Sequence, residues 1–295
     1  MFFFRLFAGI PLTALYMLSH VLFFLSYRIV RYRRALVRKN LIRSFPEKTI
    51  QEIISIEREY YRNLCDYAVE TLKLLSIGRA DLARRVVFIN AHLLEKYKST
   101  NQSVLLLASH QFNWEWLLAS GNLNLPIPID FVYQPVNNLN VDRFLIACRT
   151  RFGAHAIKRN ELAREIVKRK DQLRGVAIVA DQYPGKKHDK KFFTTFLHQE
   201  TAFFYGTNQL AALTQYPVLY AEIRKKKRGY YEVTLIELAQ PPHSRHSNDI
   251  IEQYVKAAEK IIHEYPAGWL WSHNRWKNRH LTQASAQYHR VSTAS

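Results

Sequence analysis

The sequence contains little cysteine, which excludes a disulfide-stabilised protein and a protein with a cysteine metal site. Cys65 and Cys148 are the only cysteines among 295 residues, and they lie far apart in the chain. They form neither a disulfide framework nor a metal-binding motif, which indicates a reducing compartment and ordinary buried side chains. A disordered protein is also excluded, because 48% of the residues are hydrophobic, enough for a sizeable core. The length fits one large α/β domain or two small ones.

Acidic residues are scarce relative to basic ones. Lysine and arginine number 43 against 24 aspartates and glutamates, so the formal net charge is +19. This excess predicts attraction to anionic partners, which include phosphate-bearing lipids, nucleic acids and acidic proteins. Charge alone does not choose among them.

One long stretch near the N-terminus lacks charge altogether. No Asp, Glu, Lys or Arg occurs in the 22 residues from Leu6 to Tyr27, a length that can cross a hydrocarbon core of about 30 Å. A transmembrane helix is the first interpretation. Pro11 and His20 weaken it and leave two alternatives, a helix lying in the membrane interface and a signal peptide, although no small-residue cleavage site follows.

Basic residues gather directly after this stretch. Only Arg5 and the amino terminus precede it, whereas the residues that follow include Arg28, Arg31, Arg33, Arg34, Arg38, Lys39 and Arg43. This bias predicts a single-pass anchor whose following domain is cytoplasmic. Each basic residue near anionic headgroups would add about 1 kcal/mol of attraction. We therefore expect a membrane anchor over residues 1–30, a cytoplasmic domain over 31–280 and a disordered polar tail over 281–295.

The remaining chain alternates between short apolar runs and helical patterns. Amphipathic helices are expected over residues 48–75, followed by a helix or loop over 79–97. Strands are expected over 104–108, 129–133, 154–158, 176–180, 218–223 and 231–238, and helices over 141–152, 161–173, 205–214 and 248–265. This order predicts an α/β fold, a mostly parallel sheet flanked by helices that finishes in a hairpin. The basic hairpin tip, 224–229, is expected to face solvent.

Candidate catalytic residues follow the first of these strands. The strand Val104–Ala108 ends just before His110, and Asn113 is a good N-cap for a helix in which Glu115 takes the second position. A carboxylate beside a neutral imidazole fixes its tautomer and leaves the other ring nitrogen free to act as a general base. We expect His110 and Glu115 to meet in this way. A hydrogen-bonded structural histidine is the alternative interpretation.

The chemistry implied by this pair needs no cofactor. No serine or cysteine nucleophile sits in a recognisable turn, so the attacking group would come from a substrate. The spacing of histidines, cysteines and carboxylates matches no usual zinc ligand set, so we predict neither a metal nor a cofactor.

Other candidate substrate contacts follow later strands. In α/β sheets, ligands gather at the carboxyl ends of strands, which here would place Arg159, Asp181 and Gln182 near His110. Arg159 suits a phosphate-bearing substrate, because a guanidinium can donate two parallel hydrogen bonds to phosphate. Asp181 would contact substrate or pair with Arg159, and Gln182 would contact substrate or shape the turn. Asn113 is the fourth candidate substrate contact.

Four segments in this order carry a family resemblance. They are Ser-His-Gln-Phe-Asn-Trp-Glu (109–115), Arg-x3-Val-Arg-Lys-Asn-Leu-x2-Ser-Phe-Pro-Glu (33–47), Ala-Asp-Gln-x-Pro (180–184) and Gly-Trp-Leu-Trp-Ser-His-Asn-Arg-Trp-Lys (268–277). Together they resemble the bacterial lipid A biosynthesis late acyltransferases, part of a wider glycerolipid acyltransferase group with a His-x4-Asp/Glu motif. The chain departs from the pattern at Gln111-Phe112, where many members carry Phe-Gly.

The resemblance implies a reaction, its residues and its place in the cell. A fatty acyl group would pass from an acyl carrier protein thioester to a hydroxyl of a lipid A precursor, an anionic glycolipid, at the cytoplasmic face of the inner membrane. His110 would be the base and Glu115 its orienting partner, with Arg159 and Asp181 handling substrate.

Two questions stay open on the residues alone. The acyl chain needs an apolar slot, which either of two aromatic groups would line: Phe112, Trp114 and Trp116, or Phe192, Phe193, Phe196, Phe203 and Phe204. The acceptor would alternatively be a lysophospholipid, an amino-acyl lipid or an aryl pigment precursor. A non-catalytic basic adaptor at the membrane is a further alternative, but the chain has no recognised nucleic-acid motif, so nucleic acid is not an expected partner.

Overall fold

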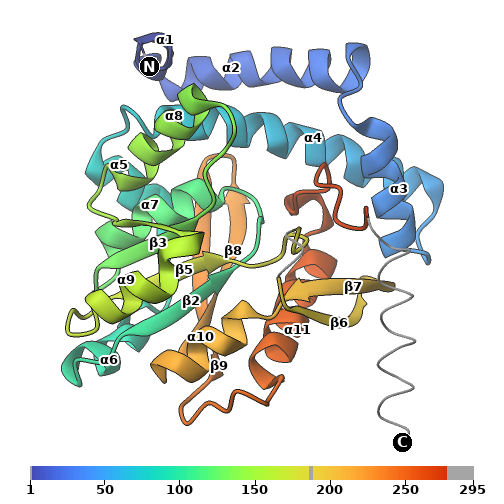
Figure 1. Ribbon diagram of the computed structural model, residues 1–295. Coiled ribbons are helices and arrows are strands. Elements are labelled where there is room, and N and C mark those ends of the chain that lie inside the picture. The colour runs from blue at the N-terminus through green and yellow to red at the C-terminus, as the bar shows by residue number, and fades with distance from the viewer. Residues whose placement is uncertain (1, 186–188, 278–295) are drawn as a thin grey trace, which may run out of the picture.

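A seven-stranded, mostly parallel sheet forms the centre of the molecule (Figure 1). The structure, a computed structural model, describes residues 2–185 and 189–277, so the expected tail over 281–295 lies outside the described residues. The strand order is β1-β9-β8-β2-β5-β3-β4, and the pairings are parallel except between β8 and β9. The strands are β1 (Val86–Phe88), β2 (Val104–Ala108), β3 (Ile129–Tyr133), β4 (Ala156–Lys158), β5 (Gly175–Val179), β8 (Val218–Lys227) and β9 (Tyr230–Ala239). The predicted fold class is confirmed.

Helices cover both faces of this sheet. β2 is buried along its whole length, as expected for a parallel strand with helices on either side. Leu105 and Leu107 face one apolar core and Val104 and Leu106 the other, because successive side chains of a strand alternate between faces. The helices are α3 (Arg34–Ser44), α4 (Ile50–Lys73), α5 (Arg79–Arg85), α6 (Glu95–Ser99), α7 (Trp114–Asn124), α8 (Leu139–Thr150), α9 (Leu162–Lys168), α10 (Gly206–Thr214) and α11 (Asp249–Glu264), with short 3₁₀ turns at Ala91–Leu94, Arg159–Glu161 and Pro266–Gly268.

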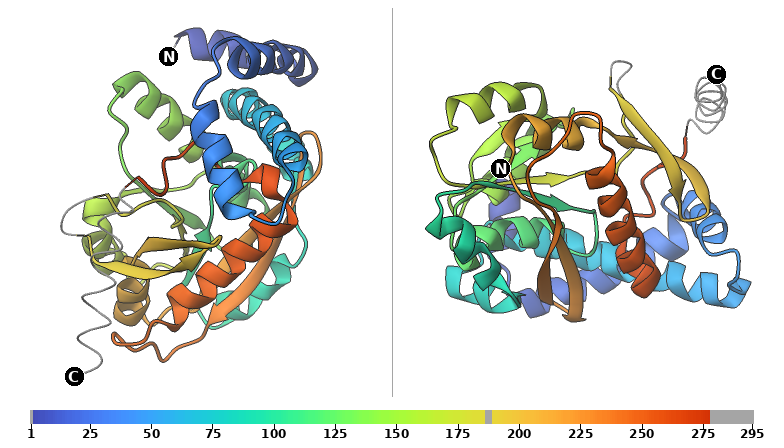
Figure 2. Two further views of the ribbon diagram at one scale, coloured as in Figure 1. Left: turned by 90° about the vertical axis from the view of Figure 1, so that its right-hand side faces the viewer. Right: turned by 90° about the horizontal axis from the view of Figure 1, so that it is seen from below.

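The uncharged N-terminal stretch is not one continuous helix. It forms α1 (Phe2–Ala8) and α2 (Leu12–Phe23), and α2 continues into a π-helical turn, η1 (Phe24–Ile29). The break falls at Pro11, which has no N–H to donate to a preceding turn. Leu12–Ile29 is the one helix among the described residues that is long and apolar enough to cross a membrane, which suggests a membrane protein. Figures 1 and 2 show α2 lying alongside α4.

Two strand features were not predicted. β1 occupies part of 79–97, where a helix or loop was expected; it has three residues, too few for a periodic pattern. β6 (Lys191–Phe196) and β7 (Gln199–Phe204) form a separate antiparallel hairpin. Its turn residues, Leu197 and His198, both have positive φ. Asn-Gly usually occupies such a turn, and because this hairpin has Leu-His instead, the sequence carries no signal for it.

The basic tip of the β8–β9 hairpin is only partly exposed to solvent. Arg228 was expected to face water, but its guanidinium pairs with the buried carboxylate of Asp66 on α4, with Nε 3.0 Å from both carboxylate oxygens. The reason is tertiary: β8 and β9 are long enough to carry the tip across to α4. The hairpin thus fastens the sheet to the helices that lead from the N-terminus.

Candidate active site

The carboxyl ends of β2 and β5 bring His110 and Asp181 together. In the parallel pairing of these strands, Ala108 is opposite Val179, so the residues two positions beyond each lie side by side. The Nδ1 atom of His110 is 2.6 Å from Oδ1 of Asp181, and the backbone N–H of His110 donates to Oδ2 at 2.9 Å. One carboxylate therefore holds both the ring and the backbone of the histidine.

Asp181 is a buried and ionised partner. Its side chain is only 2% exposed, and the indole N–H of Trp269 donates to Oδ2 at 2.7 Å. Burial alone would raise the pKa of the Asp181 carboxyl, but the adjacent His110 charge and the hydrogen bonds from His110 and Trp269 outweigh it and lower the pKa to about 2. An ionised carboxylate can only accept hydrogen bonds, so Nδ1 of His110 must carry the proton.

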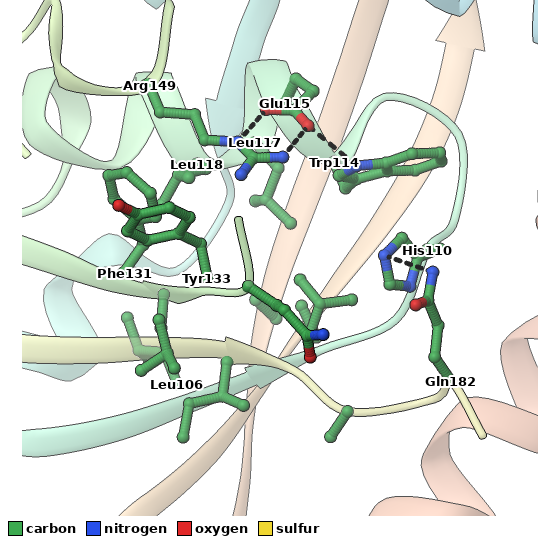
Figure 3. A pocket seen from close by; sticks show the side chains of 18 of the residues that line it. Leu106, His110, Trp114, Glu115, Leu117, Leu118, Phe131, Tyr133, Arg149 and Gln182 are labelled. Atoms are coloured by element: carbon green, nitrogen blue, oxygen red, sulfur yellow. Dashed lines mark hydrogen bonds and ion pairs between the residues drawn. The ribbon is translucent and has the colours of Figure 1, made fainter. Parts of the chain in front are cut away.

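The second ring nitrogen of His110 is therefore the basic one. In the neutral ring, Nε2 holds a lone pair, and the amide nitrogen of Gln182 lies 3.2 Å from it (Figure 3). His110 and Gln182 both line one cavity. The indole of Trp114 packs edge-on against the imidazole, with ring centroids 4.9 Å apart. A proton acceptor, Nε2 of His110, thus lies at the wall of a cavity, and the buried carboxylate of Asp181 fixes its orientation.

The predicted pairing of His110 with Glu115 is wrong in this structure. Glu115 lies at the second position of α7, as expected, but its carboxylate accepts two hydrogen bonds from Arg149 of α8, at 2.6 and 2.7 Å. Trp114 donates to the same carboxylate at 3.2 Å (Figure 3). Glu115 is 1% exposed, and the turn of α7 aims it at α8 rather than back toward the loop that carries His110.

The other predicted substrate contacts have different environments. Arg159 lines the cavity, and its guanidinium lies over the ring of Phe204, 4.4 Å from the ring centroid. It forms an ion pair with Asp189, so the alternative prediction, an ion pair between Arg159 and Asp181, is wrong. Gln182 lines the cavity as well. Asp181 faces the histidine from the buried side and is not among the residues that line the cavity, so its direct contact with substrate stays a prediction.

Asn113 serves the fold rather than the cavity. Its Oδ1 accepts the N–H of Trp116, which confirms the predicted N-cap of α7. Its Nδ2 donates to the buried carboxylate of Glu70 at 2.7 Å. Asn113 is fully buried and is not among the residues that line the cavity, so its contact with substrate stays a prediction.

An apolar cavity of about 440 Å³ extends from His110 between the sheet and helices α7 and α8. Its polar wall holds His110, Gln182, the Glu115–Arg149 pair and Arg159. The apolar wall is formed mainly by Leu106, Leu117, Leu118, Leu125, Ile129, Phe131, Val132, Leu145, Ile178 and Val179.

Neither predicted aromatic group forms this cavity. Trp116 and Phe112 are buried in the core, and Phe196 and Phe203 pack edge to face inside the β6–β7 hairpin region. Trp114 and Phe204 reach the wall, the first beside His110 and the second beneath Arg159.

The segment after α11 supports the histidine loop. The backbone N–H of Phe112 donates to the carbonyl of Gly268 at 2.7 Å, and that of Leu270 donates to the carbonyl of His110 at 3.1 Å. Phe112 itself has a φ of +48°, the left-handed region in which glycine is favoured. The departure from Phe-Gly thus places a bulky residue in a conformation that the family pattern assigns to glycine.

Three contributors to the site were not singled out from sequence: Arg149, Trp269 and His273. The only signal for Trp269 and His273 was their place in the C-terminal segment of the resemblance, and Arg149 carried none. Burial lowers the pKa of the His273 imidazole from 6.5 to about 4, so it is neutral near pH 7. Among the described residues, no group of three or more His, Cys, Asp or Glu side chains is arranged to hold a metal ion.

Comparison with known proteins identifies a family and two relatives. The family profile described as "Bacterial lipid A biosynthesis acyltransferase" matches residues 1–278. The chain is 26% identical over 274 residues to the lipid A biosynthesis palmitoleoyltransferase of Escherichia coli (strain K12), covering 90% of this chain and 88% of that protein. Identity and coverage are the same for the lipid A biosynthesis acyltransferase of Shigella flexneri.

Proposed function

The chain belongs to the bacterial lipid A biosynthesis acyltransferase family, and from this premise we propose that His110 and Asp181 catalyse acyl transfer to a lipid hydroxyl. The observation that carries the proposal is the His110–Asp181 pair at the wall of an apolar cavity. A base is needed because a neutral hydroxyl is a weak nucleophile toward a thioester.

In the proposed mechanism, Nε2 of His110 removes the proton of the acceptor hydroxyl as its oxygen attacks the thioester carbonyl. A C–O bond forms, and collapse of the tetrahedral intermediate breaks the C–S bond. The imidazolium then returns its proton to the departing thiolate. Asp181 stabilises the imidazolium through Nδ1, and its attachment to Trp269 keeps the carboxylate in place.

The cavity is proposed to hold the acyl chain. Its wall is largely leucine, isoleucine and valine, and burial of each methylene group there would contribute about 0.8 kcal/mol. Arg159, at the polar wall, is proposed to bind an anionic group of a substrate, and Gln182 to contact the reacting groups beside His110.

The substrates and their location are proposed from the family and the charge. The relatives are named for lipid A biosynthesis, and one for transfer of a palmitoleoyl group. We take the acceptor to be a lipid A precursor, and the donor an acyl carrier protein. Both are anionic, which matches a net charge of +19. The reaction would occur at the cytoplasmic face of the inner membrane.

An in vitro assay tests the function directly. Purified full-length protein is incubated with acyl carrier protein thioesters and candidate acceptors, and the product is identified by mass spectrometry. His110→Ala should lower the rate by about 10²- to 10⁴-fold while the protein remains folded.

The control is His155→Ala, which replaces an exposed histidine outside the cavity and should leave the rate unchanged. Near-normal turnover by His110→Ala would contradict the base assignment. A product formed only from a lysophospholipid, an amino-acyl lipid or an aryl pigment precursor would keep the chemistry and replace the acceptor.

A further inference from the structure

The apolar helix α2 is fastened along its length to charged groups of the folded domain. Tyr16 donates to the buried carboxylate of Glu70, and Ser19 donates to that of Asp66, both at 2.7 Å. Both acceptors lie on α4. The hydrogen-bonding residues of α2 are three positions apart, so they share one helix face.

Both ends of this N-terminal segment are also held. Before α2, Lys73 donates to the carbonyls of Ala8 and Ile10 at 3.0 and 2.9 Å. After η1, the hydroxyl of Tyr61 donates to the carbonyl of Tyr32. Helix α2 with η1 is about 27 Å long, at 1.5 Å per residue, and α4 contacts both of these elements.

The opposite face of the segment is apolar and exposed. Met17 is 71% exposed and Phe24 56%. Together with Val21, Leu25, Ile29 and Val30 they form a stripe at helical spacing, and Leu6 and Phe7 of α1 are exposed as well. Only 22% of the segment Leu12–Ile29 is buried inside the molecule. A stripe of this size on a soluble surface marks an interaction site.

The docked geometry conflicts with a helix that crosses the bilayer. If α2 spanned it, α4 would be drawn into the hydrocarbon core with it. The ion pair of Asp66 with Arg228 and the exposed charges of Arg58, Glu59 and Arg62 would then lie in lipid. Charged side chains at that depth cost several kcal/mol each, so a spanning helix would first have to leave its partners.

We propose that α2 and η1 lie in the plane of one anionic leaflet, with the apolar stripe inserted among the lipid chains and the domain on the same side. The charge distribution favours an anionic bilayer as the partner. Residues 1–46 contain eight arginines and lysines and no acidic residue, and Arg5 and Arg28 lie near the two ends of the stripe. No segment is translocated, so the domain stays on the side where it is synthesised.

This placement brings the bilayer next to the cavity. Phe4 of α1 stacks on Phe144 of α8 with ring centroids 4.5 Å apart, and Leu145 and Arg149 of α8 line the cavity wall. Figures 1 and 2 show α8 beside the N-terminal helices. A lipid in the same leaflet can therefore approach the cavity along the membrane.

Side-specific labelling of the full-length protein distinguishes the two arrangements. Arg5→Cys marks the N-terminal side of α2, and Lys260→Cys marks the domain; both side chains are exposed. Wild-type protein is the blank, because both natural cysteines are buried. A membrane-impermeant maleimide is added to right-side-out and to inside-out membrane vesicles. We expect both variants to be labelled from the same side, and labelling from opposite sides would overturn the proposal.

Vesicle binding then tests the stripe itself. Val21→Glu places a charge on the apolar stripe, and its matched control, Val167→Glu, changes a similarly exposed valine of α9. Partition of Val21→Glu onto phosphatidylglycerol vesicles should fall at least about tenfold, while the control stays near wild type. Equal partition of Val21→Glu and wild type would overturn the proposal. Neither experiment depends on acyl transfer.

Discussion

At the residue scale, two buried carboxylates near the cavity have distinct partners. Asp181 holds the imidazole of His110, while Glu115 accepts two hydrogen bonds from Arg149. The first arrangement fixes the proton of the proposed base, and the second balances a buried positive charge beside the cavity. Their substitutions should therefore affect different steps.

Asp181→Asn keeps the shape of the side chain and removes its charge. The imidazolium then loses its stabilising partner, and we expect kcat to fall by about 10²- to 10⁴-fold with little change in KM. Glu115→Gln leaves the His110 tautomer intact and should change KM more than kcat. Steady-state kinetics with both variants measures this. A large loss of kcat in Glu115→Gln with a normal Asp181→Asn would instead favour Glu115 as the orienting group.

The depressed pKa of His273 predicts a pH dependence of stability. Between its unfolded value of 6.5 and its folded value of about 4, the unfolded chain binds more protons than the folded one. The stabilisation is therefore present above pH 6.5 and is lost as the pH falls toward 4. Denaturant unfolding at about pH 7 and about pH 4.5 should show a loss of about 2 kcal/mol that His273→Gln reduces. Equal losses in both proteins would contradict this effect.

At the element scale, two helices that line the cavity begin with an asparagine cap. Asn113 caps α7 and also donates to buried Glu70, which further accepts from Tyr16 and Tyr231. Asn138 caps α8 from an exposed position by accepting two backbone N–H groups. The first cap thus joins α7 to α4, α2 and β9, whereas the second acts locally.

The two caps form a matched pair of substitutions. Asn138→Ala should cost about 1 kcal/mol, the usual value of an N-cap. Asn113→Ala should cost about 2 to 3 kcal/mol, because it also removes a donor from the buried carboxylate of Glu70. Denaturant unfolding of each variant gives the comparison. Equal costs would mean that the bond to Glu70 contributes nothing to the stability of the protein.

At the scale of the whole molecule, the cavity exists only because separate layers meet. Its walls come from β2, β3 and β5 on one side and from α7 and α8 on the other. In the sheet, Ala177 lies opposite both Leu106 and Phe131, so its small side chain leaves space between two large ones.

Ala177→Leu should therefore shorten the acyl chain that the enzyme prefers. Each methylene excluded from the cavity removes about 0.8 kcal/mol, roughly a fourfold change in kcat/KM. Competition between donors of different chain length, analysed by mass spectrometry, should show a shift of at least about two carbons. Ala68→Leu, an exposed change on α4, is the control. An unchanged preference would place the acyl chain outside the cavity.

The sequence determined the features that depend on neighbouring residues. The strands Val104–Ala108 and Ile129–Tyr133 and the Asn113 cap were predicted as they occur, because apolar runs and capping residues act locally. β1 and the β6–β7 hairpin were missed, since the first is short and the second turns at Leu197-His198, residues with no turn preference.

Tertiary structure decided which groups act together. Glu115 is near His110 in the chain, but Asp181, 71 residues away, reaches the imidazole because β2 and β5 are adjacent and in register. Hydropathy likewise gives α2 the same pattern whether it spans the membrane or lies flat on it, and our proposal that it lies flat rests on its docking to Glu70 and Asp66. Strand order, register and helix docking are non-local, so neither spacing nor composition encodes them directly.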